Sequence, residues 1–499
     1  MANSYKWRSK AILAELKELP HLNSLYIHIP NAMIMPRNLF DPEKLERYKI
    51  LIGEKWGWYG KYTTSRTLKL NNSHSFRSYE FDIWFEKVED LYLDQLGGVE
   101  DVVEALNSEK GFPELKHLCV QNSWGDLLHI FNSETAHCHT AFPVLESLYL
   151  HKLKKLKKIC EGRLYAESFT NLRTIIIRQC DELEHVFSIS MARNLSHLQE
   201  VEVTDCKNLK EIFGDEEIEE STDHADQKVH CPSLEKLILS HLDNIQLIWH
   251  NKLQADSFCK LKVSRVEFCG KLISFVPPDR LGRLSKNPQR LHRFQNLEIV
   301  RVTECWSMKN LFPVSIALGL RQLKELEINS CGLEEIVANE EVKVAAVFKF
   351  LKLDFLQLVD LPELKSFYPR SHTTELPLLK SLVVYHCHKL LSFQNTHVQS
   401  QSENQTQHPL FSPGEVISDL KLEKLSINRD DIKLICSGCS HFSGKTFHKL
   451  EDLQVVCFHD ESPVFPLDFL RRFHKLRTLV VARNEKDQTF RMPRVLMKI

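Results

Sequence analysis

The chain has 499 residues, and its 65 Lys and Arg balance 66 Asp and Glu, so the formal net charge is -1. This balance excludes the global basic field that drives non-specific binding to nucleic acid. No apolar run reaches the roughly 18 to 20 residues of a membrane span, and the first twenty residues lack the apolar stretch of a secretory signal. We therefore expect a cytoplasmic protein that neither spans a membrane nor binds nucleic acid.

Leucine is abundant, with 71 copies, and it recurs in a fixed pattern. With Φ for an apolar residue, L-x-x-Φ-x-Φ-x-x-C runs from Leu172 to Cys180, from Leu198 to Cys206, from Leu297 to Cys305 and from Leu323 to Cys331. Good copies follow one another at 26, 27 or 30 residues, a spacing typical of leucine-rich repeats. About seventeen units begin near Leu22, Leu45, Ser65, Val88, Leu115, Leu145, Leu172, Leu198, Leu234, Leu261, Leu297, Leu323, Leu353, Leu379, Leu422, Leu450 and Leu476.

Each unit is expected to form one short strand and a return segment. The last two apolar residues of L-x-x-Φ-x-Φ lie two apart, so Val201 and Val203 should be buried while Glu202 faces the other side. After the ninth position the apolar spacing changes to three, which suits a helical turn or an irregular arc. Stacked units predict an α/β repeat solenoid. This is a leucine-rich-repeat horseshoe with a parallel concave sheet and short helical or irregular convex segments.

The ninth position of a unit explains much of the cysteine content. A small side chain with a weak donor can pack inside the turn there and bond a neighbouring carbonyl. Nothing indicates an oxidising compartment, so we expect free thiols. The six cysteines at this position are Cys180, Cys206, Cys269, Cys305, Cys331 and Cys387.

Three intervals between units are too long for the period. Residues 214–230 are acidic, residues 277–293 are basic, and the stretch after residue 393 is polar with few apolar anchors. We expect residues 1–393 to form a solenoid of about fourteen units and residues 394–412 a disordered insertion. Residues 413–499 then form a C-terminal leucine-rich-repeat block.

Two motifs are similar to chemical sites but fail on spacing. Five residues separate Gly438 from Gly444 in front of Lys445, whereas a phosphate loop has four. Cys436 and Cys439 form a C-x-x-C, and the nearby histidines, His441 and His448, are not at zinc-finger spacing. No Ser/His/Asp or Cys/His set lies on a recognisable framework either. We therefore expect no metal, no cofactor, no nucleotide and no enzyme activity.

A partner surface is expected at positions three, five and seven of each strand unit. The scaffold holds these side chains rigidly there, so binding costs little ordering entropy. The alternative is that these are ordinary solvated positions and that contact falls on the loops, such as the basic stretch from Arg280 to Arg293. Aromatic and Arg residues dominate interface energetics, and an exposed Ile on a strand is otherwise unexplained. The candidate residues are therefore Tyr149, Ile176, Arg178, Arg265 and Arg301.

Several segments resemble a known family. CDELEHVFSISMARNLSHLQEVEVTDCKNLKEIF, from Cys180 to Phe213, and FPELKHLCVQNS, from Phe112 to Ser123, look like the C-terminal leucine-rich repeats of plant disease resistance proteins of the coiled-coil nucleotide-binding class. So does the opening from Leu19 to Trp58. Such receptors carry a coiled coil and a nucleotide-binding switch domain before the repeats, and this chain begins inside the repeats. We therefore expect the sensor part alone.

The resemblance implies a protein-recognition module of plant innate immunity. It would sense a pathogen effector, or a host protein that an effector has modified, and act on a switch domain in trans. The alternatives are a general leucine-rich-repeat scaffold or substrate adaptor, and a truncated regulatory decoy of a full-length resistance protein. An adaptor for ubiquitin ligation would be expected to carry an F-box-like helical segment, for which the short N-terminus leaves no room.

Overall fold

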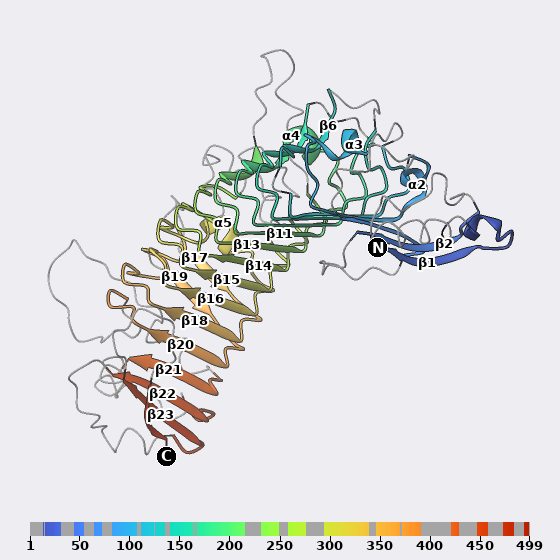
Figure 1. Ribbon diagram of the computed structural model, residues 1–499. Helices are drawn as coiled ribbons and strands as arrows, with labels where there is room; N and C mark the ends of the chain where they lie inside the picture. Colours follow the sequence, from blue (N-terminus) through green and yellow to red (C-terminus); the bar gives the residue numbers. More distant parts are fainter. Residues whose placement is uncertain are drawn as a thin grey trace, which may run out of the picture. The chain divides into compact units, whose positions relative to one another are not determined.

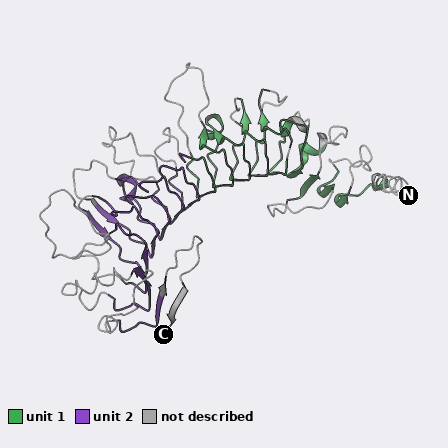
Figure 2. Cartoon of the chain, turned by 60° about the vertical axis from the view of Figure 1, so that its left-hand side comes forward, with its two compact units in different colours: residues 1–245, 252–257 green, residues 246–251, 258–499 purple. Residues whose placement is uncertain are grey.

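The structure is a computed structural model, and its contacts divide the chain into two compact units (Figure 2). Unit 1 comprises residues 1–245 and 252–257, and unit 2 comprises residues 246–251 and 258–499. The residues that the structure describes are 13, 15–30, 44–53, 64–71, 82–106, 111–123, 125–134, 140–162, 164, 167–214, 231–248, 258–275, 294–338, 346–369, 372–390, 421–428, 447–457, 473–483 and 494–498.

Unit 1 is built on a ladder of parallel strands that follow one another in chain order (Figure 1). Each strand pairs only with the strands of the preceding and the following repeat, as expected for stacked repeats. The strands are β1 (Ser24–Ile29), β2 (Arg47–Ile52), β3 (Arg66–Asn71), β4 (Asp90–Asp94), β5 (His117–Gln121), β7 (Ser147–His151), β9 (Thr174–Arg178), β11 (Glu200–Thr204) and β13 (Lys236–Ser240).

Unit 2 repeats this arrangement and ends differently. Its parallel strands also pair in chain order, and a last antiparallel strand, β24 (Arg494–Lys498), pairs with β23. The parallel strands are β14 (Val263–Glu267), β15 (Ile299–Thr303), β16 (Glu325–Asn329), β18 (Phe355–Val359), β20 (Ser381–Tyr385), β21 (Lys424–Asn428), β22 (Asp452–Cys457) and β23 (Thr478–Arg483).

The predicted repeat register is confirmed. Each of the seventeen predicted units contributes one of these parallel strands. Val201 and Val203 are at most 2% exposed, while Glu202 between them is only half-buried. The apolar frame therefore lies on one side of the sheet, and the intervening side chains lie on the other.

The return segments contain short parallel strand pairs, where the spacing of three had predicted helical turns or irregular arcs. In β10, Val186 and Phe187 are adjacent and both buried, so this segment is covered on two sides and extends rather than coils. The pairs are β6 (His129–Asn132) with β8 (Lys158–Glu161), β10 (His185–Ser188) with β12 (Glu211–Gly214), and β17 (Ala346–Lys349) with β19 (His372–Glu375).

Helices are short in the described part of the chain. The first turn of α4 is capped by Ser188, whose hydroxyl accepts a hydrogen bond from the backbone N–H of Met191 at 3.2 Å. The helices are η1 (Leu16–Glu18), α2 (Asp82–Lys87), α3 (Val102–Ala105), α4 (Ile189–Ala192) and α5 (Val314–Ala317).

Buried phenylalanines form a column through unit 1. The ring centroids of Phe112 and Phe142 are 5.4 Å apart, and those of Phe142 and Phe169 are 5.3 Å apart. Each lies three residues before the leucine that opens a repeat, and each has a positive φ between 55° and 62°. That conformation costs roughly 1 to 2 kcal/mol for a residue with a Cβ. Burial of the ring, worth about 1.5 to 3 kcal/mol, offsets this cost.

Residues with a left-handed backbone conformation also lie directly after the strands. Gln179 and Asp205, each directly before a ninth-position cysteine, have φ of 57°. The N–H of Gln179 donates to the carbonyl of Thr204 in the next repeat at 3.0 Å. The backbone thus leaves the strand while its hydrogen bonding to the neighbouring repeat continues.

The ninth-position cysteines behave as predicted. All six are buried and free, and each thiol donates to the carbonyl two residues before it, as Cys206 does to Thr204 at 3.4 Å. They fill the turn and satisfy a carbonyl there.

The predicted polar insertion, residues 394–412, lies outside the described residues, so its disorder and the domain boundary stay predictions. On either side of it, Ser381 of β20 pairs directly with Lys424 of β21. The ladder therefore continues in register from one strand to the other.

Candidate partner-binding surface

The outward side chains at positions three, five and seven of the strands form what we call the strand face. In unit 1, Tyr149 lies opposite Ile176, Ile176 lies opposite Glu202, and Glu202 lies opposite Ile238. All four side chains are half-buried. The ladder thus brings the predicted residues Tyr149 and Ile176 side by side in an apolar row that one carboxylate interrupts.

Arg178, another predicted residue, is held by an ion pair within unit 1. Its Nε and Nη2 lie 2.9 and 2.5 Å from Oε1 of Glu202 on the next strand. Both groups are partly buried, so the pair is shielded from salt better than a fully exposed one. Arg178 therefore borders Ile176 with its charge already neutralised.

The two predicted arginines of unit 2 lie opposite each other on β14 and β15. Arg301 is paired twice, through Nη2 to Glu325 at 3.0 Å and through Nε to Glu327 at 3.1 Å. Arg265 makes no such close ion pair with a described residue, but its charge, like that of Arg301, favours the ionised form of Glu327 and so acts to lower the pKa of that carboxyl. The three predicted arginines are thus not equivalent.

The strand face at β4 and β5 is buried, which the sequence did not predict, whereas Lys69 and Asn71 on the same face of β3 are half-buried. All five residues of β4 and all five of β5 are buried. Lys69 on β3 places its Nζ 4.6 Å from the ring centre of Tyr92, and burial lowers the pKa of Lys69 to about 8. On β4 and β5 the outward side chains therefore pack inside the protein.

Asp94 is the best-satisfied polar group of this buried face. The carboxylate is 2% exposed and accepts amide hydrogen bonds from Gln121 at 3.0 Å, from Asn122 at 2.6 Å and from Asn71. Charge-assisted bonds of this kind offset the desolvation of a buried carboxylate.

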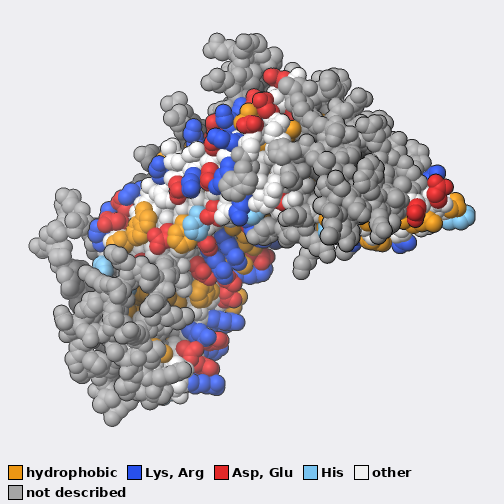
Figure 3. Space-filling view, in the orientation of Figure 1, with side chains coloured by type: hydrophobic (Ala, Val, Ile, Leu, Met, Phe, Trp, Pro, Cys, Tyr) orange, Lys and Arg blue, Asp and Glu red, His pale blue; other side chains and the backbone are white. Residues whose placement is uncertain are grey.

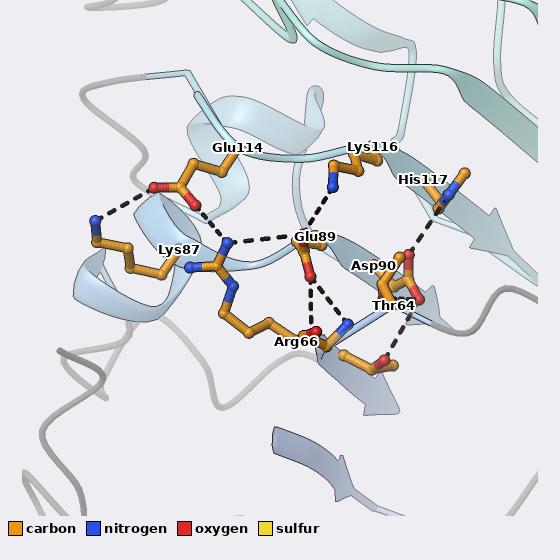
Figure 4. Close-up of polar contacts among 10 residues, drawn as sticks. Thr64, Arg66, Lys87, Glu89, Asp90, Glu114, Lys116 and His117 are labelled. Carbon is orange, nitrogen blue, oxygen red and sulfur yellow. Dashed lines mark hydrogen bonds and ion pairs between the residues drawn. The ribbon is translucent and has the colours of Figure 1, made fainter. Parts of the chain in front are cut away.

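Asp90 and His117 form a second buried pair on neighbouring strands (Figure 4). Oδ2 of Asp90 accepts hydrogen bonds from the hydroxyls of Thr64 and Thr67, and Oδ1 lies 3.9 Å from Nε2 of His117. Burial raises the pKa of Asp90, and it lowers the pKa of His117 to about 4. At neutral pH the imidazole is therefore uncharged.

A chain of charges runs beside this pair, where the strands begin (Figure 4). Arg66 bonds Glu114 at 2.6 Å, Lys87 bonds the same carboxylate at 3.2 Å, and Lys116 bonds Glu89 at 2.8 Å. Burial favours a raised pKa for Glu89, but Lys116 and Arg66 hold it below its usual value. Three successive repeats are joined by these contacts.

Cys119, His117 and Asp90 combine the residue types of a nucleophile, a base and an orienting acid. Cys119 and His117 lie on the same side of β5, and Asp90 lies opposite His117. Burial raises the pKa of the Cys119 thiol to about 12, which opposes thiolate formation. The arrangement fits a buried structural cluster better than an activated thiol.

Alternating charges precede the strands of unit 2. Lys324 bonds Glu298 at 2.7 Å, and Lys262, Asp354 and Lys380 continue the alternation in their own repeats. Figure 3 shows blue and red side chains alternating along this edge. Since successive charges cancel, this edge offers no single sign to a charged partner.

The sequence analysis missed three exposed aromatic residues, of which Tyr26 on β1 is 63% exposed and the other two lie in unit 2. Phe268 is 42% exposed and follows β14 directly, and Trp306 is 48% exposed in the turn after β15. The indole N–H of Trp306 donates to Glu304 at 2.9 Å. Other repeats carry Lys154, Asp181 or Lys207 where Trp306 stands, so a large apolar residue there was the available signal.

The two rejected motifs lie mainly outside the described residues. This holds for residues 429–446, which contain Cys436, Cys439, His441 and Lys445. Among the described residues, no group of three or more His, Cys, Asp or Glu could hold a metal ion. No helix among them is long and apolar enough to cross a membrane.

Comparison with known sequences gives one family. The model described as "Plant disease resistance protein RPS2-like, leucine-rich repeats" matches residues 63–207, 167–286 and 284–332. A probable disease resistance protein of Arabidopsis thaliana is 41% identical over 75 residues, which are 15% of this chain and 8% of that protein. The chain thus matches only a small part of that relative's length.

Two solved structures are similar at low sequence identity. The crystal structure of a TLR13–ssRNA13 complex aligns with 93% of this chain and 78% of that chain, at 12% identity and a TM-score of 0.23. That of PEPR1–AtPEP1 aligns with 92% of this chain and 80% of that chain, at 13% identity and a TM-score of 0.14.

Proposed function

Because the chain belongs to the RPS2-like leucine-rich-repeat family of plant disease resistance proteins, we propose that it recognises a protein in plant defence. The partner is a pathogen effector or a host protein that an effector has modified. A nucleotide-binding switch domain acting in trans is the second partner. The protein works in the cytoplasm, and the free thiols of its described cysteines agree with a reducing compartment.

The row formed by Tyr149 and Ile176 carries this proposal. These half-buried side chains lie opposite each other on rigid, paired strands, so binding orders little that is not already ordered. An aromatic residue beside an aliphatic one offers the apolar centre that protein interfaces need. The activity is binding rather than catalysis, and the raised pKa of Cys119 supports this view.

The experiment is capture from plant tissue with and without infection. Tagged protein is compared with a Tyr149→Ala/Ile176→Ala variant, and captured proteins are identified by mass spectrometry. Leu378→Ala is the matched control, because Leu378 is an exposed apolar residue, 44% exposed, away from the row. A partner seen only after infection, lost with the double variant and kept with the control, is the expected result.

Two other results would change the assignment. Capture that survives the double variant but disappears when residues 280–293 are deleted would move the surface to the basic stretch. Capture of ubiquitin-ligase subunits in both tissues would favour the adaptor alternative, and capture of a full-length resistance protein alone would favour the decoy.

A further inference from the structure

The charged side chains on the open strand face of unit 1 neutralise one another. On β9, β11 and β13 they form two ion pairs. Nη2 of Arg178 lies 2.5 Å from Oε1 of Glu202, and Nζ of Lys236 lies 2.6 Å from Oε1 of Glu200. Apart from His151, the remaining outward side chains of β7, β9, β11 and β13 are uncharged. The formal charge of this face is therefore zero when the histidine is neutral.

His151 is held in its neutral form. Burial lowers the pKa of its imidazole, and the positive charges of Lys152 and Arg178 lower it further, while a hydrogen bond with Gln179 acts the other way. Because the ordinary value is about 6.5, the imidazole carries no charge at neutral pH. Lys152 follows β7 and lies outside the strand face. The open strand face itself therefore offers a partner no charge that is not already bound.

Glu202 lies in the middle of an otherwise apolar row. It lies opposite Ile176 on one side and Ile238 on the other, and Tyr149 lies opposite Ile176. We call Tyr149, Ile176, Glu202 and Ile238 the neutral row. The side chain of Glu202 is only 13% exposed, so its carboxylate is largely removed from water. Its charge depends on the guanidinium of Arg178 for compensation.

The ion pair leaves one carboxylate oxygen of Glu202 available. Nε and Nη2 of Arg178 both donate to Oε1, at 2.9 and 2.5 Å. The other oxygen, Oε2, is not buried and accepts no hydrogen bond from a described residue. The neutral row thus presents one acceptor, with its charge already balanced, between apolar side chains.

We propose that the neutral row binds an uncharged, apolar segment of a protein partner, and that the ion pair between Arg178 and Glu202 sets this specificity. An aromatic or aliphatic side chain of the segment packs on Tyr149 and Ile176, and a neutral N–H or O–H group donates to Oε2 of Glu202. A charged side chain of the partner would lose its hydration without meeting a free counter-charge. The inference rests on the proposed function and adds the chemistry of the partner.

The test is selection from a random dodecapeptide library displayed on phage, with the full chain immobilised. On the wild type we expect the enriched peptides to be rich in aromatic and aliphatic residues, with no excess of acids or bases over the unselected library. Their recovery should fall about tenfold or more on Tyr149→Ala/Ile176→Ala, because two central apolar contacts are lost. The affinity of a synthetic enriched peptide should change by less than about twofold between low and high salt, since no net charge attracts it.

Variants of the ion pair test its part in specificity. Arg178→Gln leaves the carboxylate of Glu202 without its counter-charge, so selected peptides should contain at least about twofold more Lys and Arg than those of the wild type. Arg178→Gln/Glu202→Gln should select uncharged peptides again. Lys236→Gln is the matched control, because it also removes one positive charge but frees Glu200, which lies outside the neutral row. The control should select the same peptides as the wild type.

Glu202→Gln tests the same pair from the other side. It frees the guanidinium of Arg178 and should enrich Asp and Glu, so the test stays decisive if thermal unfolding shows that Arg178→Gln does not fold.

Three results would overturn the inference. One is enrichment of acidic or basic peptides on the wild type. Another is a shift toward basic peptides that is absent from folded Arg178→Gln or equally large with Lys236→Gln. The third is a wild type that enriches no peptide beyond Tyr149→Ala/Ile176→Ala. The proposed function is judged separately, because capture of a partner from infected tissue can succeed when the selected peptides are charged.

Discussion

Two regions of unit 1 share one repeat frame and differ in what their outward side chains do. In β9 and β11 burial alternates along the strand, so the face opposite the core is partly open. In β4 and β5 every residue is buried, so the same face is closed. The repeat register therefore fixes which side chains point outward, and it does not decide whether solvent or a partner can reach them.

The chemistry of the two regions follows this difference. At β9 and β11 the outward polar groups form a partly exposed pair, Arg178 with Glu202. At β4 and β5 an aspartate binds three amides and a histidine is kept neutral by burial. A polar group on the closed face must be satisfied from within the chain, whereas one on the open face can bind water or a partner.

The largest expected effect tests the frame that both regions share. Val203→Asp places a charge without a partner in the buried row, and we expect a loss of more than about 4 kcal/mol in the free energy of unfolding. Hydrogen exchange should show β9, β11 and β13 opening together, because each repeat relies on its neighbours. Thr204→Asp, one residue further and half-buried, should stay within about 1 kcal/mol by chemical denaturation. Equal losses would mean that the register is wrong.

The next effect tests the closed face against the open one at the same position of the repeat. Asp94→Ala removes the acceptor of Asn71, Gln121 and Asn122, and it should lower the free energy of unfolding by about 2 to 4 kcal/mol. Thr204→Ala on the open face should change it by less than about 0.5 kcal/mol. Urea denaturation of both variants measures the difference, and a mild effect at Asp94 would show that its face is open in solution.

The smallest expected effect is a pH dependence of the free energy of unfolding that comes from a histidine on the closed face. Because the pKa of His117 is lowered to about 4 in the fold, the unfolded chain binds a proton first as the pH falls below 6.5. The contribution of the neutral imidazole is present above pH 6.5 and is lost as the pH falls toward 4. It amounts to about 3 kcal/mol at most. Asp90, whose pKa is raised, acts in the opposite direction and reduces the net loss.

The variant His117→Gln isolates the contribution of His117 to the pH dependence of the free energy of unfolding. Denaturation of the wild type and the variant at pH 7.5 and pH 5.0 should show a smaller loss of stability in the variant. His197→Gln is the control, because His197 is exposed. Parallel losses in all three proteins would show that His117 is hydrated in the folded state.

Much of the fold could be predicted because the apolar residues of each repeat recur at a fixed spacing. Val201, Val203 and Cys206 stand at fixed intervals, and burial of each follows from strand alternation and the turn after it. The positive φ of Phe142 could not be predicted in this way, since only the stacked rings of neighbouring repeats make that conformation favourable. The short strand at Val186 was missed because it pairs with β12 of the next repeat.

The positions of the candidate surface residues could be predicted from the sequence. Their burial and their ion pairs could be predicted less well. Tyr149 and Ile176 lie on the strand face, as alternation requires, and their role in binding stays a prediction. Arg178 meets Glu202 diagonally, whereas Arg301 meets Glu327 directly opposite and Glu325 diagonally, and alternation alone does not predict these ion pairs. The burial of the outward side chains of β4 was not predicted, because strand alternation fixes the direction of a side chain and not whether it is covered.

The ladder also bears on how such a protein can diversify. Thr174 on β9 pairs with Glu200 on β11, 26 residues later, whereas Glu200 pairs with Lys236 after 36 residues and Ser381 with Lys424 after 43, in the same parallel register. The sheet therefore accepts ten to seventeen extra residues between strands without shifting a hydrogen bond. Insertions at these places can therefore change in sequence during evolution while the pairing of the sheet stays the same. For engineering, the same intervals are the natural positions to graft a binding peptide or a reporter domain.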